Sequence, residues 1–175
     1  LKTIFEENSI ETVVHTACNY GRNNESINEI IKSNLLLGLE ILDISTKFNV
    51  SSFINTDTFL EKKINNYSLS KKQFTEWLDF YSNLIQVVNI KIEHFYGEND
   101  DDIKLVQWIL SELQGNANEI NLTKGEQERD FIYIDDVVSA YIFILKNLSI
   151  MDRYNEFELG TGEPITVKLF IEKLK

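Results

Sequence analysis

Short apolar runs alternate with segments of helical periodicity in the first half of the chain, and this alternation most limits the folds open to it. Residues 12–16 (TVVHT), 52–55 and 86–92 (QVVNIKI) are typical of short strands. Residues 28–48 and 67–84 lie between these runs and repeat apolar side chains with the helical period. Strands joined by such crossovers lie parallel, so the order predicts a doubly wound α/β sheet.

The pattern changes after Gly97, where an acidic loop at 98–102 begins. The elements predicted beyond it are a helix at 103–113, a short strand at 119–122, a helix at 135–148, a strand at 157–160 and a helix from 166. Asp135 and Asp136 fall in the first turn of their helix, where carboxylates face the positive end of the dipole. We expect the last helix to continue beyond residue 175.

A dinucleotide-binding fold also needs a strand followed by a glycine-rich turn, and this sequence shows no such turn. The only closely spaced glycines, Gly160 and Gly162, come late and lack a third partner. Either the chain is not a Rossmann enzyme, or it begins partway through one. We expect the gene to encode the missing strand, turn and helix upstream of Leu1.

Charge and cysteine content exclude several functions. The net charge is -11, which repels phosphate backbones, so we expect no nucleic-acid partner. No apolar run approaches the roughly 20 residues that cross a bilayer, so we expect no membrane partner.

Cys18 is the single cysteine and cannot form an internal disulfide, which favours the cytoplasm. His15 and His94 lack metal-ligand spacing, so we expect no metal. The sequence is compatible with a homodimer.

Tyr67 and Lys71 are the candidate catalytic pair. Positions i and i+4 share one face of a helix, so the phenol and the ammonium could point into one cleft. A free Tyr has a pKa near 10, and a neighbouring cation lowers that pKa towards a value at which protons exchange readily. The spacing alone is weak evidence, because a surface helix with an amphipathic Tyr and a solvated Lys gives the same pattern.

Seven segments strengthen the interpretation because they occur together and in order. They are VVHTACNYGR (13–22), NLLLGLEIL (34–42), FINTDTF (53–59), YSLSKKQFTEW (67–77), HFYGEND (94–100), RDFIYIDDV (129–137) and FELGTGE (157–163). The series resembles the extended short-chain dehydrogenase/reductase family, the NAD-dependent nucleotide-sugar epimerases, dehydratases and reductases. Residues 53–59, 65–77 and 92–101 are most similar to the CDP-abequose synthase branch, whose members reduce the 4-keto group of a CDP-linked 3,6-dideoxy sugar.

The resemblance implies a fold and a division of the chain. Residues 1–97 would be the second part of an NAD(P)-binding Rossmann domain whose N-terminal GxxGxxG segment is absent. Residues 98–175 would be mainly a substrate-binding lobe, incomplete at its C-terminus, with segments that return to the Rossmann domain. The expected fold class is therefore α/β, a partial Rossmann doubly wound parallel sheet with a small C-terminal substrate-binding lobe.

The resemblance also implies three catalytic residues. Tyr67 would protonate the C4 oxygen of the sugar as hydride arrives, and Lys71 would hold the nicotinamide ribose and lower the pKa of Tyr67. A hydroxyl at the end of the second strand would hydrogen-bond the same oxygen. Counting along the strand from Phe53 selects Thr58, whereas the turn after the strand favours Thr56. We take Thr58, because strand register is the more constrained quantity, and keep Thr56 as the alternative.

Other residues match family positions close to the ligands. Thr16, Ala17 and Cys18 follow the first strand and would border the diphosphate and ribose of NAD or NADP. Asn34 would support the substrate site from within its helix, the alternative being an exposed polar residue.

Two residues of the second half are candidate contacts to the nucleotide-sugar substrate. His94 follows the third strand, where ligands collect, and would line the substrate pocket; a structural histidine is the alternative. Arg129 would meet the nucleotide through its planar donor fork, with a salt bridge to Asp130 or Asp136 as the alternative.

The implied function is NAD(P)H-dependent reduction of the 4-keto group of a nucleotide-linked deoxy sugar for surface polysaccharides. A 4-epimerase or dehydratase of the same family is the first alternative, and a non-catalytic sugar-nucleotide-binding protein is the second. Dehydratases of the family usually carry an Asp-Glu pair after the catalytic Thr. Neither Thr56 nor Thr58 is followed by such a pair, so dehydration is disfavoured. We expect the segment by itself to be inactive.

Overall fold

The computed structural model describes residues 1–115, 119–120 and 122–174, which divide into two compact units. The first unit comprises Leu1–Ile92 and Asn147–Glu158, and the second comprises Glu93–Lys146 and Leu159–Lys175. The chain therefore leaves the first unit after a strand and returns to it for one more.

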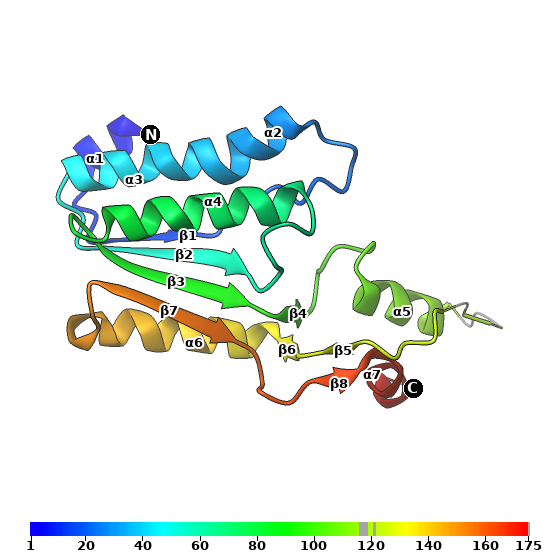
Figure 1. The fold of residues 1–175 in the computed structure, drawn as a ribbon. Helices are drawn as coiled ribbons and strands as arrows, with labels where there is room; N and C mark the ends of the chain where they lie inside the picture. The colour runs from blue at the N-terminus through cyan, green and yellow to red at the C-terminus, as the bar shows by residue number, and fades with distance from the viewer. Residues whose placement is uncertain (116–118, 121, 175) are drawn as a thin grey trace. The chain divides into compact units, whose positions relative to one another are not determined.

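A four-stranded parallel sheet in the order β1-β2-β3-β7 forms the centre of the first unit (Figure 1). Its strands are β1 (Thr12–His15), β2 (Ser52–Thr58), β3 (Gln86–Ile92) and β7 (Tyr154–Leu159). In the register, Phe53 of β2 lies opposite Val13 of β1 and Val87 of β3. The predicted α/β parallel sheet is confirmed. The second strand is longer than expected, because β2 continues through polar residues to Thr58.

Helices cover one face of this sheet in the first unit (Figure 1). They are α1 (Lys2–Glu7), α2 (Ile27–Ile31), the π-helical turn η1 (Lys32–Leu36), α3 (Leu37–Lys47) and α4 (Asn66–Tyr81); a 3₁₀ turn, η2 (Leu148–Ile150), precedes β7. The helix predicted at 28–48 is thus confirmed as α2, η1 and α3 in continuous succession. It begins with a capping box, in which Ser26 and Glu29 each bond the backbone N–H of the other.

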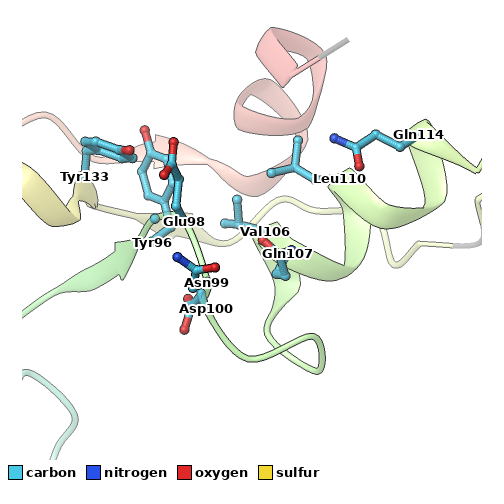
Figure 2. Close-up of a pocket in the computed structure, with 10 residues that line it drawn as sticks. Tyr96, Glu98, Asn99, Asp100, Val106, Gln107, Leu110, Gln114 and Tyr133 are labelled. Atoms are coloured by element: carbon cyan, nitrogen blue, oxygen red, sulfur yellow. The ribbon is translucent and has the colours of Figure 1, made fainter.

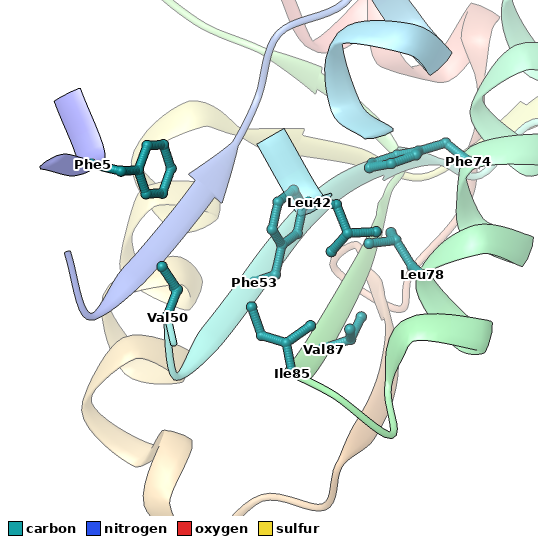
Figure 3. Packing of buried hydrophobic residues seen from close by; sticks show 8 residues of the cluster. All are labelled: Phe5, Leu42, Val50, Phe53, Phe74, Leu78, Ile85 and Val87. Atoms are coloured by element: carbon teal, nitrogen blue, oxygen red, sulfur yellow. The ribbon is translucent and has the colours of Figure 1, made fainter. Parts of the chain in front are cut away.

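The core of the first unit lies between these helices and the sheet (Figure 3). Its buried members are Phe5, Leu42, Val50, Phe53, Phe74, Leu78, Ile85 and Val87. Gly38 lets α3 approach α4, because a Cβ atom at this position would lie 2.7 Å from Cζ of Phe74. The close approach fixes α4, which carries the candidate catalytic pair, against its neighbour.

The described residues of the second unit form two small strand pairs and three helices. Its elements are β4 (His94–Tyr96), α5 (Leu105–Gln114), β5 (Glu128–Arg129), β6 (Phe131–Tyr133), α6 (Ile134–Asn147), β8 (Ile165–Thr166) and α7 (Val167–Leu174). Strands β4 and β6 pair in parallel, and β5 and β8 pair antiparallel. Ile109, Val167 and Ile171 form its buried cluster, and the rings of Phe131 and Phe170 stack at 3.8 Å.

One element predicted for the second unit is wrong. Residues 119, 120 and 122 are not in a strand, and residue 121 of the predicted strand lies outside the described residues. Four residues of mixed apolar and polar character are too few to distinguish a strand from a loop.

Candidate active site

Helix α4 presents the two residues expected at the centre of the site. It begins at Asn66 because Asn65 and Ser68 form a capping box: the Asn65 side chain accepts a hydrogen bond from the Ser68 N–H at 2.8 Å, and the Ser68 hydroxyl accepts one from the Asn65 N–H at 3.2 Å. Tyr67 therefore lies in the first turn, and Lys71 follows one turn later on the same side.

Tyr67 is enclosed by the loop after β1 and by the end of β2. Its ring centroid lies 4.9 Å from that of Tyr20. Burial raises the pKa of Tyr67 above the ordinary value, and the nearby Tyr20 and Cys18 groups raise it further. Interaction with the Thr58 hydroxyl acts in the opposite direction. The phenol therefore stays protonated, which is the form that a proton donor needs.

Lys71 and Lys72 are adjacent in sequence but have different surroundings. Lys71 is only 1% exposed, and burial lowers the pKa of its ammonium, while Cys18 and Asp57 act in the opposite direction. Lys72, in contrast, forms a 2.8 Å salt bridge with Asp57. The expected lowering of the Tyr67 pKa by Lys71 is not found, because burial disfavours the charged forms of both groups and dominates.

Thr58 is the threonine whose hydroxyl acts on Tyr67. Its Oγ1 accepts a hydrogen bond from the Leu60 N–H at 3.2 Å, which leaves the hydroxyl hydrogen available for another partner. Thr56, the alternative, lies two residues earlier in β2 and is half-buried. The structure thus places the Thr58 hydroxyl next to the phenol, and the choice of Thr58 over Thr56 as the catalytic threonine stays a prediction.

Asn34 is fully buried in η1 and joins the loop after β1 to α4. Its Oδ1 accepts a hydrogen bond from the Asn19 N–H at 2.6 Å, and its Nδ2 donates to the Asn19 carbonyl at 2.8 Å and to the Ser70 hydroxyl at 3.0 Å. The Ser70 hydroxyl donates in turn to the Tyr67 carbonyl at 2.8 Å. Both amide hydrogens are therefore used within the protein. The alternative of an exposed Asn34 is wrong, because the side chain is fully buried and bonded within the protein.

The loop after β1 places the three expected cofactor-binding residues at the carboxyl end of the sheet. Thr16 and Ala17 are exposed, and Cys18 is half-buried with a free thiol. Cys18 lies close enough to influence the charge states of both Tyr67 and Lys71. The first unit thus brings this loop together with Thr58, Tyr67 and Lys71.

His94 and Arg129 form a second group, within the second unit. Burial lowers the pKa of His94, and the positive charge of Arg129 lowers it further. The alternative for Arg129, a salt bridge to Asp130 or Asp136, is not formed among the described residues. Asp130 instead accepts hydrogen bonds from the N–H groups of Thr161 at 2.9 Å and Gly162 at 2.8 Å. A neutral imidazole and a guanidinium without an ion pair among the described residues can both meet a polar ligand.

The second unit also contains a pocket of about 430 Å³ beside α5 (Figure 2). Its lining residues are Tyr96, Gly97, Glu98, Asn99, Asp100, Val106, Gln107, Leu110, Gln114 and Tyr133. The rings of Tyr96 and Tyr133 lie 5.5 Å apart, centroid to centroid. Aromatic faces with a few polar groups are typical of small-molecule pockets. His94 and Arg129 are not among the lining residues.

Two negative findings hold for the described residues. No group of three or more His, Cys, Asp or Glu side chains among them could hold a metal ion. None of the helices in the described ranges combines the length and apolar character needed to cross a membrane.

Comparison with known proteins defines the class. The chain belongs to the NAD dependent epimerase/dehydratase family, whose model matches residues 1–160. CDP-abequose synthase from Salmonella typhimurium is 35% identical over 187 residues, which cover 100% of this chain and 62% of that protein. UDP-glucuronate 4-epimerase from Thermodesulfobacterium geofontis is 27% identical over 200 residues, which cover 100% of this chain and 59% of that protein. The chain therefore spans about three fifths of the length of these relatives.

Solved structures have the same fold. UDP-glucuronic acid 4-epimerase from Bacillus cereus, in complex with NAD, superposes with a TM-score of 0.85 at 17% identity, covering 99% of this chain and 60% of that one. UDP-glucose 4-epimerase from Thermotoga maritima, with UDP-glucose, gives a TM-score of 0.84 at 23% identity, covering 99% and 63%. The predicted membership of the family and the Rossmann-like fold are confirmed.

Sequence reasoning missed several residues that shape the first unit's site. Asn19 and Ser70 complete the contacts of Asn34, and Asp57 pairs with Lys72 beside Thr58. One signal was present, since Asp57 is a carboxylate next to Thr58 in a strand that is mostly buried. A carboxylate there needs a partner.

Proposed function

We propose that the protein containing this chain reduces the 4-keto group of a nucleotide-linked deoxy sugar with NADH or NADPH, as a member of the CDP-abequose synthase branch. The observation that carries the proposal is the grouping, in one unit, of a protonated Tyr67, the Thr58 hydroxyl and the buried Lys71 cation. The similarity to CDP-abequose synthase supports this reaction over others of the family.

The cofactor would be NAD or NADP, as NAD is in several structural neighbours. When bound, it supplies the hydride. The residues present fit such a group, because the Lys71 ammonium is buried at the carboxyl end of the sheet without a salt bridge to any described carboxylate. Ribose hydroxyls would satisfy it, and the exposed Thr16 and Ala17 with the neighbouring Cys18 would border the diphosphate.

The chain's own residues then supply the proton. Tyr67 donates its phenolic proton to the C4 oxygen of the sugar, and its raised pKa keeps that proton in place until the oxygen becomes basic. The Thr58 hydroxyl orients the same oxygen and interacts with the phenolate that is left. A cation at Lys71 would favour that phenolate, as an opposite charge close by does, but in the free chain burial outweighs any such effect and the pKa of Tyr67 is raised.

Elimination is disfavoured by the state of Asp57. If Thr56 were the catalytic threonine, Asp57 would stand where a dehydratase carries its first acidic residue. Asp57 is buried and paired with Lys72, so it is not available to exchange a proton with a sugar. A 4-epimerase is the second candidate, favoured by the fold shared with two UDP-sugar 4-epimerases.

The second unit would bind the nucleotide sugar. His94 and Arg129 supply polar groups for it, and the Tyr96–Tyr133 pocket is large enough for part of such a ligand. Asn34 would act on the substrate only indirectly, through the loop and helix that it joins. A cytoplasmic location and a homodimer complete the proposal; the single cysteine supports the former.

Cofactor stoichiometry tests the reaction. The full-length protein is given a CDP-linked 4-keto-3,6-dideoxyhexose and NADPH or NADH, and the nicotinamide absorbance is followed together with the sugar products. A reductase oxidises one cofactor per sugar. Interconversion of two sugar nucleotides without net cofactor consumption would assign the epimerase instead, and cofactor binding without turnover of either substrate would assign a binding protein.

A further inference from the structure

We propose that the buried Asp57–Lys72 ion pair is a positioning unit for the reaction, which fixes the backbone of Thr58 on both sides and so sets where its hydroxyl meets Tyr67. The inference rests on the function proposed above, because Thr58 matters only if its hydroxyl takes part in the reaction. Neither residue of the pair would touch the substrate.

The geometry closes a ring around one residue. Oδ1 of Asp57 accepts a hydrogen bond from the Thr58 N–H at 2.7 Å, and the Lys72 ammonium donates to the Thr58 carbonyl at 2.6 Å. The ring closes through the 2.8 Å contact between Lys72 Nζ and Asp57 Oδ2. Both peptide groups that flank the Thr58 side chain are therefore held by charged groups, which form the stronger kind of hydrogen bond.

The pair is also anchored to the elements on either side of it. Asp57 Oδ2 accepts a hydrogen bond from Thr75 Oγ1 on α4 at 3.1 Å and from Asn89 Nδ2 on β3 at 3.3 Å. Lys72 directly follows Lys71 on the helix that also carries Tyr67. The ring thus connects the end of β2 to the helix that carries the candidate proton donor. The position of the Thr58 hydroxyl is therefore coupled to that of the Tyr67 hydroxyl.

A purely structural role explains the arrangement less well. The Asp57 side chain is completely buried and that of Lys72 is 16% exposed. Buried ion pairs are seldom more stabilising than apolar side chains of similar volume. Stability alone therefore gives little reason for a charged pair at this position, whereas fixing one residue between a strand and a helix does.

The test uses the full-length protein and replaces the pair by apolar side chains, in Asp57→Leu/Lys72→Met. Apolar replacement of both partners leaves no unpaired charge, so the thermal unfolding temperature should stay close to that of the wild type. We expect kcat with the CDP-linked 4-keto sugar to fall roughly 10- to 100-fold, since small misplacements of a reacting group have effects of this size. KM should change little, because the pair does not contact the substrate.

A double-mutant cycle separates positioning from general structure. In a Thr58→Val background the same pair of replacements should cause little further loss of kcat, because the group that they position is gone. An equal further loss in that background, or unchanged kcat in the folded pair variant, would overturn the inference. Wild-type turnover of Thr58→Val alone would instead refute the role of Thr58 in the proposed function.

A matched control and a milder variant complete the design. Lys62 and Glu76 form an exposed salt bridge that also joins the segment after β2 to α4 without contacting Thr58, so Lys62→Met should leave kcat unchanged. If the pair variant does not fold, Lys72→Gln and Lys72→Met decide the question. Gln can still donate to the Thr58 carbonyl and should retain more activity than Met; equal kcat in the two would contradict the proposal.

Discussion

The two ends of strands β2 and β3 are equally buried and chemically opposite. At the amino end, Phe53 and Val87 lie in the apolar cluster beneath α3 and α4. At the carboxyl end, on the same face of the sheet, Asn55, Asp57 and Asn89 are as well buried. Their side chains form a hydrogen-bonded series, in which Asn55 Nδ2 donates to Asn89 Oδ1 at 2.8 Å.

The difference shows where the chain accepts an energetic cost. An unpaired buried polar group costs about 1–3 kcal/mol, so the polar end is tolerable only because nearly every group has a partner. Asn55 Oδ1 and His15 Nε2 are buried there without one. The amino ends of the strands therefore stabilise the fold through apolar burial. At the carboxyl ends, polar groups are buried at a cost in stability. Substitutions at the two ends should separate stability from activity.

The largest effect is expected at the amino end. Phe53→Ala should lower the free energy of unfolding by about 3–5 kcal/mol, because it leaves a cavity in a cluster that cannot collapse. Denaturant titration measures the loss, and kcat per folded molecule should stay near the wild-type value. Phe80, on the outer side of α4 and 72% exposed, is the control, and Phe80→Ala should have little effect. Similar losses in both variants would break the comparison.

Acid sensitivity is expected to come from the carboxyl end. Burial, with a contribution from Lys71, lowers the pKa of His15 from 6.5 to about 4. Between these pH values the unfolded chain binds a proton that the folded one refuses, so stability is lost as pH falls from 6.5 to 4, by about 3 kcal/mol at most. His15→Phe should remove this part of the pH dependence. Unfolding free energies across that range compare the two proteins, and parallel curves would refute the assignment.

Replacing Tyr67 should lower activity and leave the stability of the protein unchanged. Tyr67→Phe keeps the ring against Tyr20 and removes only the hydroxyl. We expect kcat of the full-length enzyme to fall by at least about 100-fold, which corresponds to about 2.7 kcal/mol in activation free energy. The dissociation constant of the cofactor and the unfolding temperature should stay close to wild type. Near-normal turnover would show that Tyr67 is not the proton donor.

Replacing Lys71 also separates stability from binding, because the stability of the free protein and the affinity for the cofactor should respond differently. Burial lowers the pKa of this ammonium, so its charged form destabilises the free protein at neutral pH. Lys71→Met should therefore leave the stability of the free protein unchanged or raise it. The cofactor dissociation constant should rise about tenfold, since a hydrogen bond from a charged group contributes about 1.5 kcal/mol or more. Unfolding and cofactor titrations test both, and an unaltered dissociation constant would remove Lys71 from the cofactor site.

The elements predicted from the sequence are those with strong local signals. The period of the apolar residues located α4, and the run from Gln86 to Ile92 located β3 in full. β2 was predicted to end at Asn55 because the polar residues Thr56, Asp57 and Thr58 follow its apolar run. The pairs β4–β6 and β5–β8 involve two or three residues each and depend on distant partners, so no local pattern indicates them.

The candidate site was predicted in its residues more than in its contacts. Helical spacing was enough to put Tyr67 and Lys71 on one side of α4. The contacts of Asn34 with Asn19 and Ser70 depend on a π-helical turn, which alters the spacing that a regular helix would give. Spacing could not show that Lys71 is buried while Lys72 pairs with Asp57, because both depend on residues distant in sequence. The catalytic and ligand-binding roles themselves stay predictions.

Gly38 of α3 connects the apolar core to the candidate site, because it packs against the helix α4 that carries Tyr67 and Lys71. The single hydrogen atom that serves as its side chain faces the ring of Phe74, which is fully buried, so a larger side chain there would require the ring or its helix to shift. Adding one methyl group there would have to push α4 sideways, and Tyr67 and Lys71 would move with it. A substitution as conservative as Gly38→Ala, within the apolar core, would therefore displace the candidate catalytic residues on α4. The position of Tyr67, the candidate proton donor, therefore depends in part on the small size of Gly38.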